Sequence, residues 1–76
     1  MLTVAKGERD TTFGDRLREL RAAAELTQAA LAEKAGIQVN SVARLERGAY
    51  QPSWDVVRKL AAALGVEPND FLPREE

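Results

Sequence analysis

Apolar residues along most of the chain recur every three or four positions, which is the spacing of one helical face. The first such face consists of Phe13, Leu17, Leu20 and Ala24. Thr12 lies just before it, with Asp15 three residues later in an arrangement similar to a capping box. The pattern predicts a helix over residues 13–25.

Two short helices follow, and each is bounded by residues that favour helix ends. Thr27 is an N-cap candidate for a helix over residues 28–35, and Gly36 is placed to adopt the left-handed conformation that often ends a helix. A third helix begins near residue 38 or 39 and is closed by Gly48. The residues expected to face inward are Leu31, Ala32 and Ala35 in one helix and Val42 and Leu45 in the other.

The last third of the chain predicts two more helices. After a loop at residues 49–52, Ser53 caps a helix that Gly65 ends, and Pro68 fits the first position of a short fifth helix. The apolar face of the fourth helix is Trp54, Val57, Leu60, Ala61 and Leu64, and that of the fifth is Phe71 and Leu72.

The composition agrees with one small helical domain. The chain has 76 residues, 45% of them hydrophobic, and its apolar share relies on alanine and leucine, which favour helices. We expect an all-α domain at residues 12–73, with residues 1–11 as a flexible arm and residues 74–76 as a short tail. No apolar run is long enough to cross a bilayer, and the first ten residues lack the apolar stretch of a signal peptide. We therefore expect a cytoplasmic protein without a membrane partner.

The composition also excludes most catalytic and metal-binding chemistry. The sequence contains no cysteine and no histidine, so it has no disulfide and no zinc site built on thiolate or imidazole. There is no glycine-rich phosphate loop, and acidic pairs such as Asp15 and Glu19 are expected on an exposed helix face. We expect no enzyme activity, no metal, no cofactor and no small-molecule ligand.

The net charge, taken alone, argues against a nucleic-acid partner. With 11 basic and 12 acidic side chains the net charge is −1, whereas proteins that bind a phosphate backbone usually carry a basic excess. The distribution of charged residues along the chain is more favourable to a nucleic-acid partner than the net charge is. Acidic residues lie near the ends of the chain, and basic residues lie in its middle. The central basic residues are Lys34, Arg44, Arg47 and Arg58. A local basic face is therefore compatible with this sequence.

The segment from Thr27 to Gly48, TQAALAEKAGIQVNSVARLERG, resembles the Cro/repressor-type (Xre-like) helix-turn-helix family. The likeness covers about residues 13–72. The matching residues are Thr27-Gln28, Leu31-Ala32, Gly36-Ile37, Val42, Leu45-Glu46, Gly48, Pro52-Ser53, Leu60-Ala61 and Leu64-Gly65-Val66. The resemblance implies a compact five-helix lambda-repressor-like domain, with the helix-turn-helix formed by its second and third helices. The alternative is that these alanines, glycines and leucines simply pack a helical bundle.

The resemblance implies that the helix at about residues 39–47 lies in the major groove of double-stranded DNA. Its base-facing candidates are Val39, Asn40 and Arg44, with Gln38 and Ser41 beside them. Asparagine can bond adenine, and arginine can bond guanine, through two hydrogen bonds. Val39 departs from the polar residue often found at its position and would at most contact a thymine methyl group. For Arg44, a phosphate contact or a solvated position is the alternative.

Other residues are implied to contact the DNA backbone. Gln28 lies at a helix N-terminus, where free N–H groups favour an anion, and its alternative is a solvated polar residue. The residues with the same implied role around the next loop are Arg47, Tyr50 and Gln51. The alternative for Tyr50 is that it covers the edge of the core. For Trp54 we expect packing against Tyr50 rather than a dimer contact.

The resemblance further implies an ion pair between Glu46 and Arg21. Such a pair would be partly buried and would tie the first helix to the end of the third. Glu46 then has a scaffold role and is not an acid catalyst.

The sequence thus predicts a sequence-specific transcriptional regulator that binds a palindromic operator as a homodimer. Dimer contacts are expected from Val66, Pro68, Phe71 and Leu72. The alternative is an antitoxin or adaptor module, in which binding to a toxin or another regulator dominates. The near-neutral charge and the departure at Val39 favour this alternative slightly.

Overall fold

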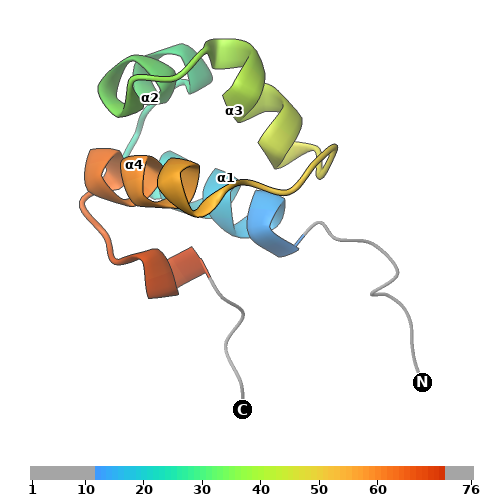
Figure 1. The fold of residues 1–76 in the computed structure, drawn as a ribbon. Coiled ribbons are helices and arrows are strands. Elements are labelled where there is room, and N and C mark those ends of the chain that lie inside the picture. Colours follow the sequence, from blue (N-terminus) through green and yellow to red (C-terminus); the bar gives the residue numbers. More distant parts are fainter. Residues whose placement is uncertain (1–11, 72–76) are drawn as a thin grey trace.

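The computed structural model describes residues 12–71, and its elements are short helices (Figure 1). They are α1 (Thr12–Ala23), α2 (Gln28–Ala35), α3 (Val39–Glu46), α4 (Trp54–Leu64) and the 3₁₀-helix η2 (Pro68–Phe71). No strand occurs among residues 12–71, so the all-α class is confirmed. The predicted arm at residues 1–11, Leu72 and the predicted tail at residues 74–76 lie outside the described residues.

Helix α2 begins and ends where local chemistry predicts. The hydroxyl oxygen of Thr27 accepts a hydrogen bond from the N–H of Ala30 (3.0 Å), which caps the start of the helix. Gly36 has a φ of +74°, and the N–H of Ile37 donates to the carbonyl of Ala32 (3.0 Å). These bonds end α2 after about two turns and lead the chain directly into α3.

Two helix predictions need correction. Helix α1 ends two residues earlier than predicted, because Glu25 adopts a φ of +60° and the N–H of Leu26 donates back to the carbonyl of Arg21. The expected short fifth helix is a single turn of 3₁₀-helix rather than an α-helix, and in it the N–H of Asp70 donates to the carbonyl of Glu67 three positions back (2.9 Å). Four residues are too few for a run of α-helical hydrogen bonds. The described domain therefore has four α-helices and η2.

The core lies where the four α-helices meet. Its largest fully buried side chains are Leu17, Leu31, Val42, Leu45 and Leu60. Helix α3 packs against both α1 and α2, and α4 packs against α2. One side of α3 is therefore left on the outside of the domain (Figure 1).

The short helix η2 packs against α1 and α4, at the end of the domain away from α3 (Figure 1). Phe71 is buried, and its ring centroid lies 4.8 Å from that of Phe13. Arg16 Nε donates to the carbonyl oxygen of Asp70 at 2.7 Å. These contacts hold the last described turn of the chain on the core.

Helices α1 and α3 approach each other at Gly14 with no room for a side chain. A Cβ atom at this position would lie 2.4 Å from the carbonyl oxygen of Leu45 and 2.8 Å from that of Glu46. Both distances are shorter than Cβ contacts in proteins, so glycine is needed here for the close approach of two backbones. The carboxyl end of α3 is thereby fixed against the first turn of α1.

Candidate nucleic-acid interface

Helix α3 has a buried side and an exposed side. The buried residues are Val42, Leu45 and Glu46. The exposed residues on the helix and at its two ends are Gln38, Val39, Asn40, Arg44 and Arg47. Ser41 is half-buried at the edge between the two sides. The residues predicted to face bases are thus brought together on one surface, and Val39 places a large apolar side chain there with 45% of its surface exposed.

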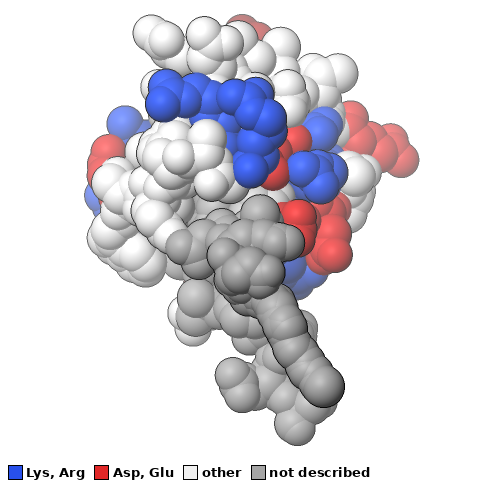
Figure 2. All heavy atoms as spheres, turned by 90° about the vertical axis from the view of Figure 1, so that its right-hand side faces the viewer, with Lys and Arg blue, Asp and Glu red and all other residues white. Residues whose placement is uncertain are grey.

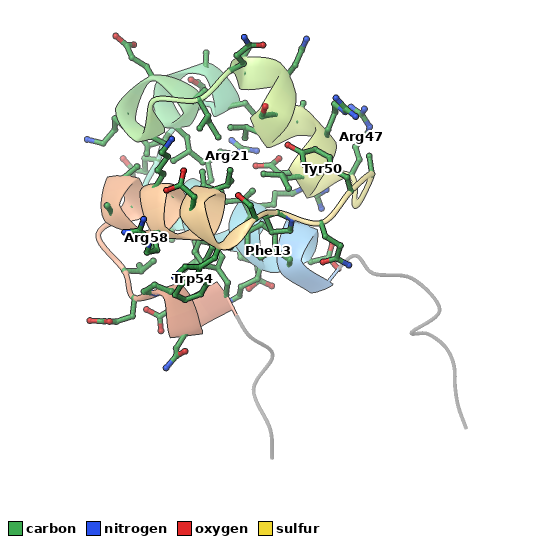
Figure 3. All side chains as sticks on the ribbon, viewed as in Figure 1. Phe13, Arg21, Arg47, Tyr50, Trp54 and Arg58 are labelled. Carbon is green, nitrogen blue, oxygen red and sulfur yellow. The ribbon has the colours of Figure 1, made fainter. Side chains whose placement is uncertain are left out.

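Lysine and arginine side chains gather on the side of the domain where α3 ends (Figure 2). Arg47 and Tyr50 both belong to the segment that links α3 to α4 (Figure 3). Neither Arg44 nor Arg47 forms an ion pair with another described residue, and both are exposed. Within residues 12–71, positive charge without an ion-pair partner therefore lies next to the exposed helix, although the net charge of the chain is −1.

The guanidinium of Arg44 lies over the ring of Tyr50. Its central carbon lies 5.0 Å from the ring centroid, within the range of a cation–π contact. Tyr50 is 37% exposed, so its ring is only partly used to cover the protein interior. Gln51 follows it as an exposed residue of the same loop.

Behind the exposed side of α3, the carboxylate of Glu46 is the centre of a polar cluster. Its side chain is 3% exposed. Arg21 Nε donates to Glu46 Oε2 at 2.6 Å and Arg21 Nη2 to Glu46 Oε1 at 3.1 Å, so the guanidinium holds both carboxylate oxygens. Arg21 Nη1 also donates to the carbonyl of Leu26 at 2.9 Å. Arg21 and Glu46 therefore form a bidentate ion pair in the structure.

Two further residues complete the Glu46 cluster. Gln28 Nε2 donates to Glu46 Oε1 at 2.9 Å. Arg18 Nη2 donates to the backbone carbonyl of Glu46 at 2.9 Å, and Arg18 Nε lies 3.9 Å from Glu46 Oε1. Through this one carboxylate, α1 and the start of α2 are both bonded to the end of α3.

The surroundings of Glu46 favour its charged form. Burial raises the pKa of the Glu46 carboxyl, but the hydrogen bonds from Arg21 and Gln28 and the charges of Arg21 and Arg18 outweigh burial, so the pKa lies below its ordinary value. The hydrogen bond to Glu46 in turn raises the pKa of Arg21, against the opposite effect of burial. Both groups are charged at neutral pH.

This lowered pKa gives the first testable prediction, which concerns stability in acid. The folded-state pKa of Glu46 lies below its ordinary value of 4.5, so the stabilisation is complete above that value and is lost as the pH falls through the lower, folded pKa. The Glu46→Gln variant should be less stable at pH 7 and should lose less stability than the parent chain between about pH 5 and pH 2. Urea unfolding followed by circular dichroism at several pH values measures this, and parallel pH profiles for the two proteins would contradict it.

The position of Gln28 differs from the outward one suggested by its place at a helix start. Its side chain is half-buried, and its amide nitrogen is directed to Glu46. A phosphate contact by Gln28 stays a prediction, and in the structure the residue also links α2 to α3.

The residues predicted for a dimer contact are not equally available. Phe71 is 2% exposed and packs on Phe13, so its side chain belongs to the core of its own chain and does not form an outer surface. Val66 and Pro68 are half-buried, and Leu72 lies outside the described residues. The predicted packing of Trp54 is wrong, because 64% of its surface is exposed at the start of α4.

Sequence reasoning missed three features of this site. Arg18 and Gln28 were not expected to contact Glu46. Helical spacing predicts which side of a helix a residue lies on, but not the conformation that its long side chain adopts. Gly14 was not singled out, although a glycine in the first turn of a helix is itself a signal of close backbone approach.

Other kinds of site find no support in the part of the chain that the structure describes. Residues 12–71 contain no group of three or more acidic, cysteine or histidine residues that could hold a metal ion. Over the same residues, no helix combines the length and the apolar character needed to span a membrane.

Comparison with protein families agrees with this geometry. Residues 12–72 match a family described as a helix-turn-helix domain. The restriction-modification controller protein C.AhdI from Aeromonas hydrophila is 42% identical to this chain, with a TM-score of 0.80 over 82% of this chain and 94% of that one. The P22 c2 repressor, solved in complex with a synthetic operator, is 28% identical, with a TM-score of 0.73 over 79% of this chain and 91% of the repressor.

A longer relative matches as well. The immunity repressor protein of Bacillus phage phi105 is 36% identical over 64 residues, which are 84% of this chain and 44% of the repressor. The chain thus spans less than half the length of that relative.

Proposed function

Because this chain belongs to the helix-turn-helix domain family, we propose that it is a sequence-specific transcriptional regulator that binds double-stranded DNA with α3 in the major groove. The observation that carries this proposal is the two-sided character of α3. Its outer side presents side chains able to read base edges, while Glu46 on its inner side is held by three residues. A recognition helix needs both an exposed reading side and a fixed position.

Asn40 and Arg44 carry most of the proposed base reading. An asparagine can bond adenine and an arginine can bond guanine in the major groove, each discriminating by about 1–3 kcal/mol. Val39 can contribute an apolar contact with a thymine methyl group, and its 45% exposure leaves it accessible for that. Gln38 and Ser41 lie beside these three and are proposed as secondary contacts.

A second group of residues is proposed to bind phosphates. Arg47 and the loop residues Tyr50 and Gln51 are exposed at the end of α3, and Gln28 lies at the start of α2. Phosphate contacts fix the orientation of a protein on the duplex without reading its sequence. The two groups together define a mode of binding in which α3 reads bases and the flanking segments hold the backbone.

We further propose that two copies bind a palindromic operator, with half-sites about 34 Å apart so that both α3 helices enter the same side of the duplex. The surface proposed for this contact comprises Val66, Pro68 and Leu72. We also propose that Trp54 contributes to the dimer contact, which was the alternative to its packing against Tyr50. Sedimentation over a concentration series should show a dimer at micromolar concentration. A monomer throughout would refute this part of the proposal.

Selection of binding sites from random DNA tests the function itself. The expected result is a preferred sequence with two-fold symmetry, and an affinity for it that falls steeply as salt rises, because bound phosphates release counterions. Binding that selects no sequence, or that does not respond to salt, would overturn the proposal.

The second testable prediction separates base reading from phosphate binding. Arg44→Ala should relax the preference at one position of each half-site, by about 1–3 kcal/mol, and leave the other positions unchanged. The matched control is Arg47→Ala, which should weaken binding to all sequences about equally and reduce the salt slope by about 1. Competition binding against single base-pair variants measures both. The opposite pattern would mean that α3 is oriented differently in the groove.

A second candidate function is an antitoxin or adaptor module in which a protein partner dominates. The net charge of −1 favours it, because a strong phosphate binder usually carries a basic excess. A protein of this kind would show weak DNA binding with little salt dependence. Under either function we expect no catalytic activity, no cofactor and a cytoplasmic place of action.

A further inference from the structure

The path of the chain after α3 brings Tyr50 back to Arg44. Gly48 has a φ of +73°, and the N–H of Ala49 donates to the carbonyl oxygen of Arg44 at 2.9 Å. The N–H of Gly48 donates to the carbonyl of Leu45 at 3.1 Å. This paired closure reverses the chain at the end of the helix. Since Ala49 is bonded to the backbone of Arg44, the next residue emerges beside the Arg44 side chain.

The contact with Tyr50 places the charge of the Arg44 guanidinium over the ring. The central carbon of the guanidinium is 5.0 Å from the ring centroid. A guanidinium carries five N–H donors, more than a contact with one ring can occupy. Arg44 makes no ion pair with another described residue, whereas the exposed Arg58 is paired with Asp55 at 3.1 Å. The donors of Arg44 are therefore not occupied by an ion pair within residues 12–71.

We propose that Tyr50 is a positioning residue for Arg44, holding the guanidinium over its ring at the exposed side of α3, from where it can form two hydrogen bonds with a guanine. This inference rests on the proposed function, in which Arg44 reads a base. An arginine side chain free in solvent loses rotamer freedom when it binds, and a side chain already held loses less. Tyr50 thus acts on sequence preference through Arg44, which is a different role from its phosphate contact.

The position of Arg44 in the free protein can be tested without DNA. Protons of the Arg44 side chain that lie over an aromatic ring are shifted upfield in the NMR spectrum. The parent chain and Tyr50→Phe should both show this shift, because phenylalanine keeps the ring, and Tyr50→Leu should lose it. An Arg44 signal at the same position in all three proteins would overturn the proposal.

The effect on sequence preference is tested with the same variants and a double variant. Tyr50→Leu should reduce discrimination at the position read by Arg44 by about two- to five-fold, the range expected for an exposed cation–π contact. Tyr50→Phe should retain that discrimination. In an Arg44→Ala background, Tyr50→Leu should cause no further loss at that position. Equal weakening at every sequence, additive with Arg44→Ala, would make Tyr50 an independent backbone contact and overturn the proposal.

The proposed function and the positioning role of Tyr50 are rejected by different results. A parent chain that selects no DNA sequence rejects the proposed function, and with it the reading role of Arg44. A parent chain that selects a sequence, but whose preference at the Arg44 position survives Tyr50→Leu, rejects the positioning role alone.

Discussion

The Arg21→Ala variant is expected to lose about 3–5 kcal/mol of its free energy of unfolding, because the Glu46 carboxylate would stay buried without its main partner. The Glu46 side chain is 3% exposed, and Arg21 supplies two of its hydrogen bonds. Proteins are stable by about 0.05–0.15 kcal/mol per residue, so this loss would remove a large part of the stability of a 76-residue chain. Urea unfolding followed by circular dichroism measures the change.

Two further variants make the Arg21 result interpretable. Arg58→Ala removes an arginine that is also ion-paired, with Asp55 at 3.1 Å, but whose side chain is 59% exposed. It should cost less than about 1 kcal/mol, because exposed pairs contribute little. The double variant Arg21→Met with Glu46→Leu should be more stable than Arg21→Ala, since no charge is left buried. An Arg21→Ala chain as stable as Arg58→Ala would mean that Glu46 is reached by water.

The second large effect is expected at Gly14, where the usual rule for helices should be reversed. Replacing glycine by alanine inside a helix normally adds about 0.5–1 kcal/mol of stability. Here the new methyl group would lie 2.4 Å from the carbonyl oxygen of Leu45 and 2.8 Å from that of Glu46. Both atoms belong to the backbone and cannot rotate away, so we expect a loss of about 1–3 kcal/mol or more.

A matched control for Gly14→Ala lies in the same helix. Ala22 is exposed in α1, and Ala22→Gly should destabilise the chain by about 0.5–1 kcal/mol through helix propensity alone. Alanine is thus favoured at one position of α1 and glycine at the other. DNA binding by Gly14→Ala at a temperature where it remains folded should also weaken, because α3 must move away from α1. A Gly14→Ala chain as stable as the parent would show that the two backbones do not approach this closely.

The features that could be predicted from the sequence are those that depend on residues close together in the chain. The cap at Thr27, the left-handed turn at Gly36 and the apolar spacing of the helices involve residues a few positions apart, and the all-α class follows from them. The start of η2 at Pro68 was predicted, but its type was not, because a proline start and two apolar residues do not distinguish an α-helix from one 3₁₀ turn.

What could not be predicted depends on contacts between distant segments. A glycine in the first turn of a helix signals a close approach, but no local pattern tells that the partner of Gly14 is the end of α3, 31 positions later at Leu45. The pair between Arg21 and Glu46 was implied by a family resemblance, but the contacts from Arg18 and Gln28 depend on side-chain directions in the folded domain.

Along α4, the regular apolar spacing was misleading at one end. Leu60 is fully buried, Val57 is half-buried and Trp54 is 64% exposed, so burial decreases toward the start of the helix. Periodicity identifies the side of a helix that faces the core, but not how far along the helix the core extends. Trp54 lies on the correct side, beyond that limit.

The exposure of Trp54 has a consequence for spectroscopy. It is the single tryptophan of the chain, and its indole is already largely in water when the domain is folded. Its fluorescence should therefore shift little in wavelength when the chain unfolds, so this emission is a poor reporter of folding. The same indole would shift to shorter wavelength if a second copy or another protein covered it. In this chain, intrinsic fluorescence is suited to detecting association.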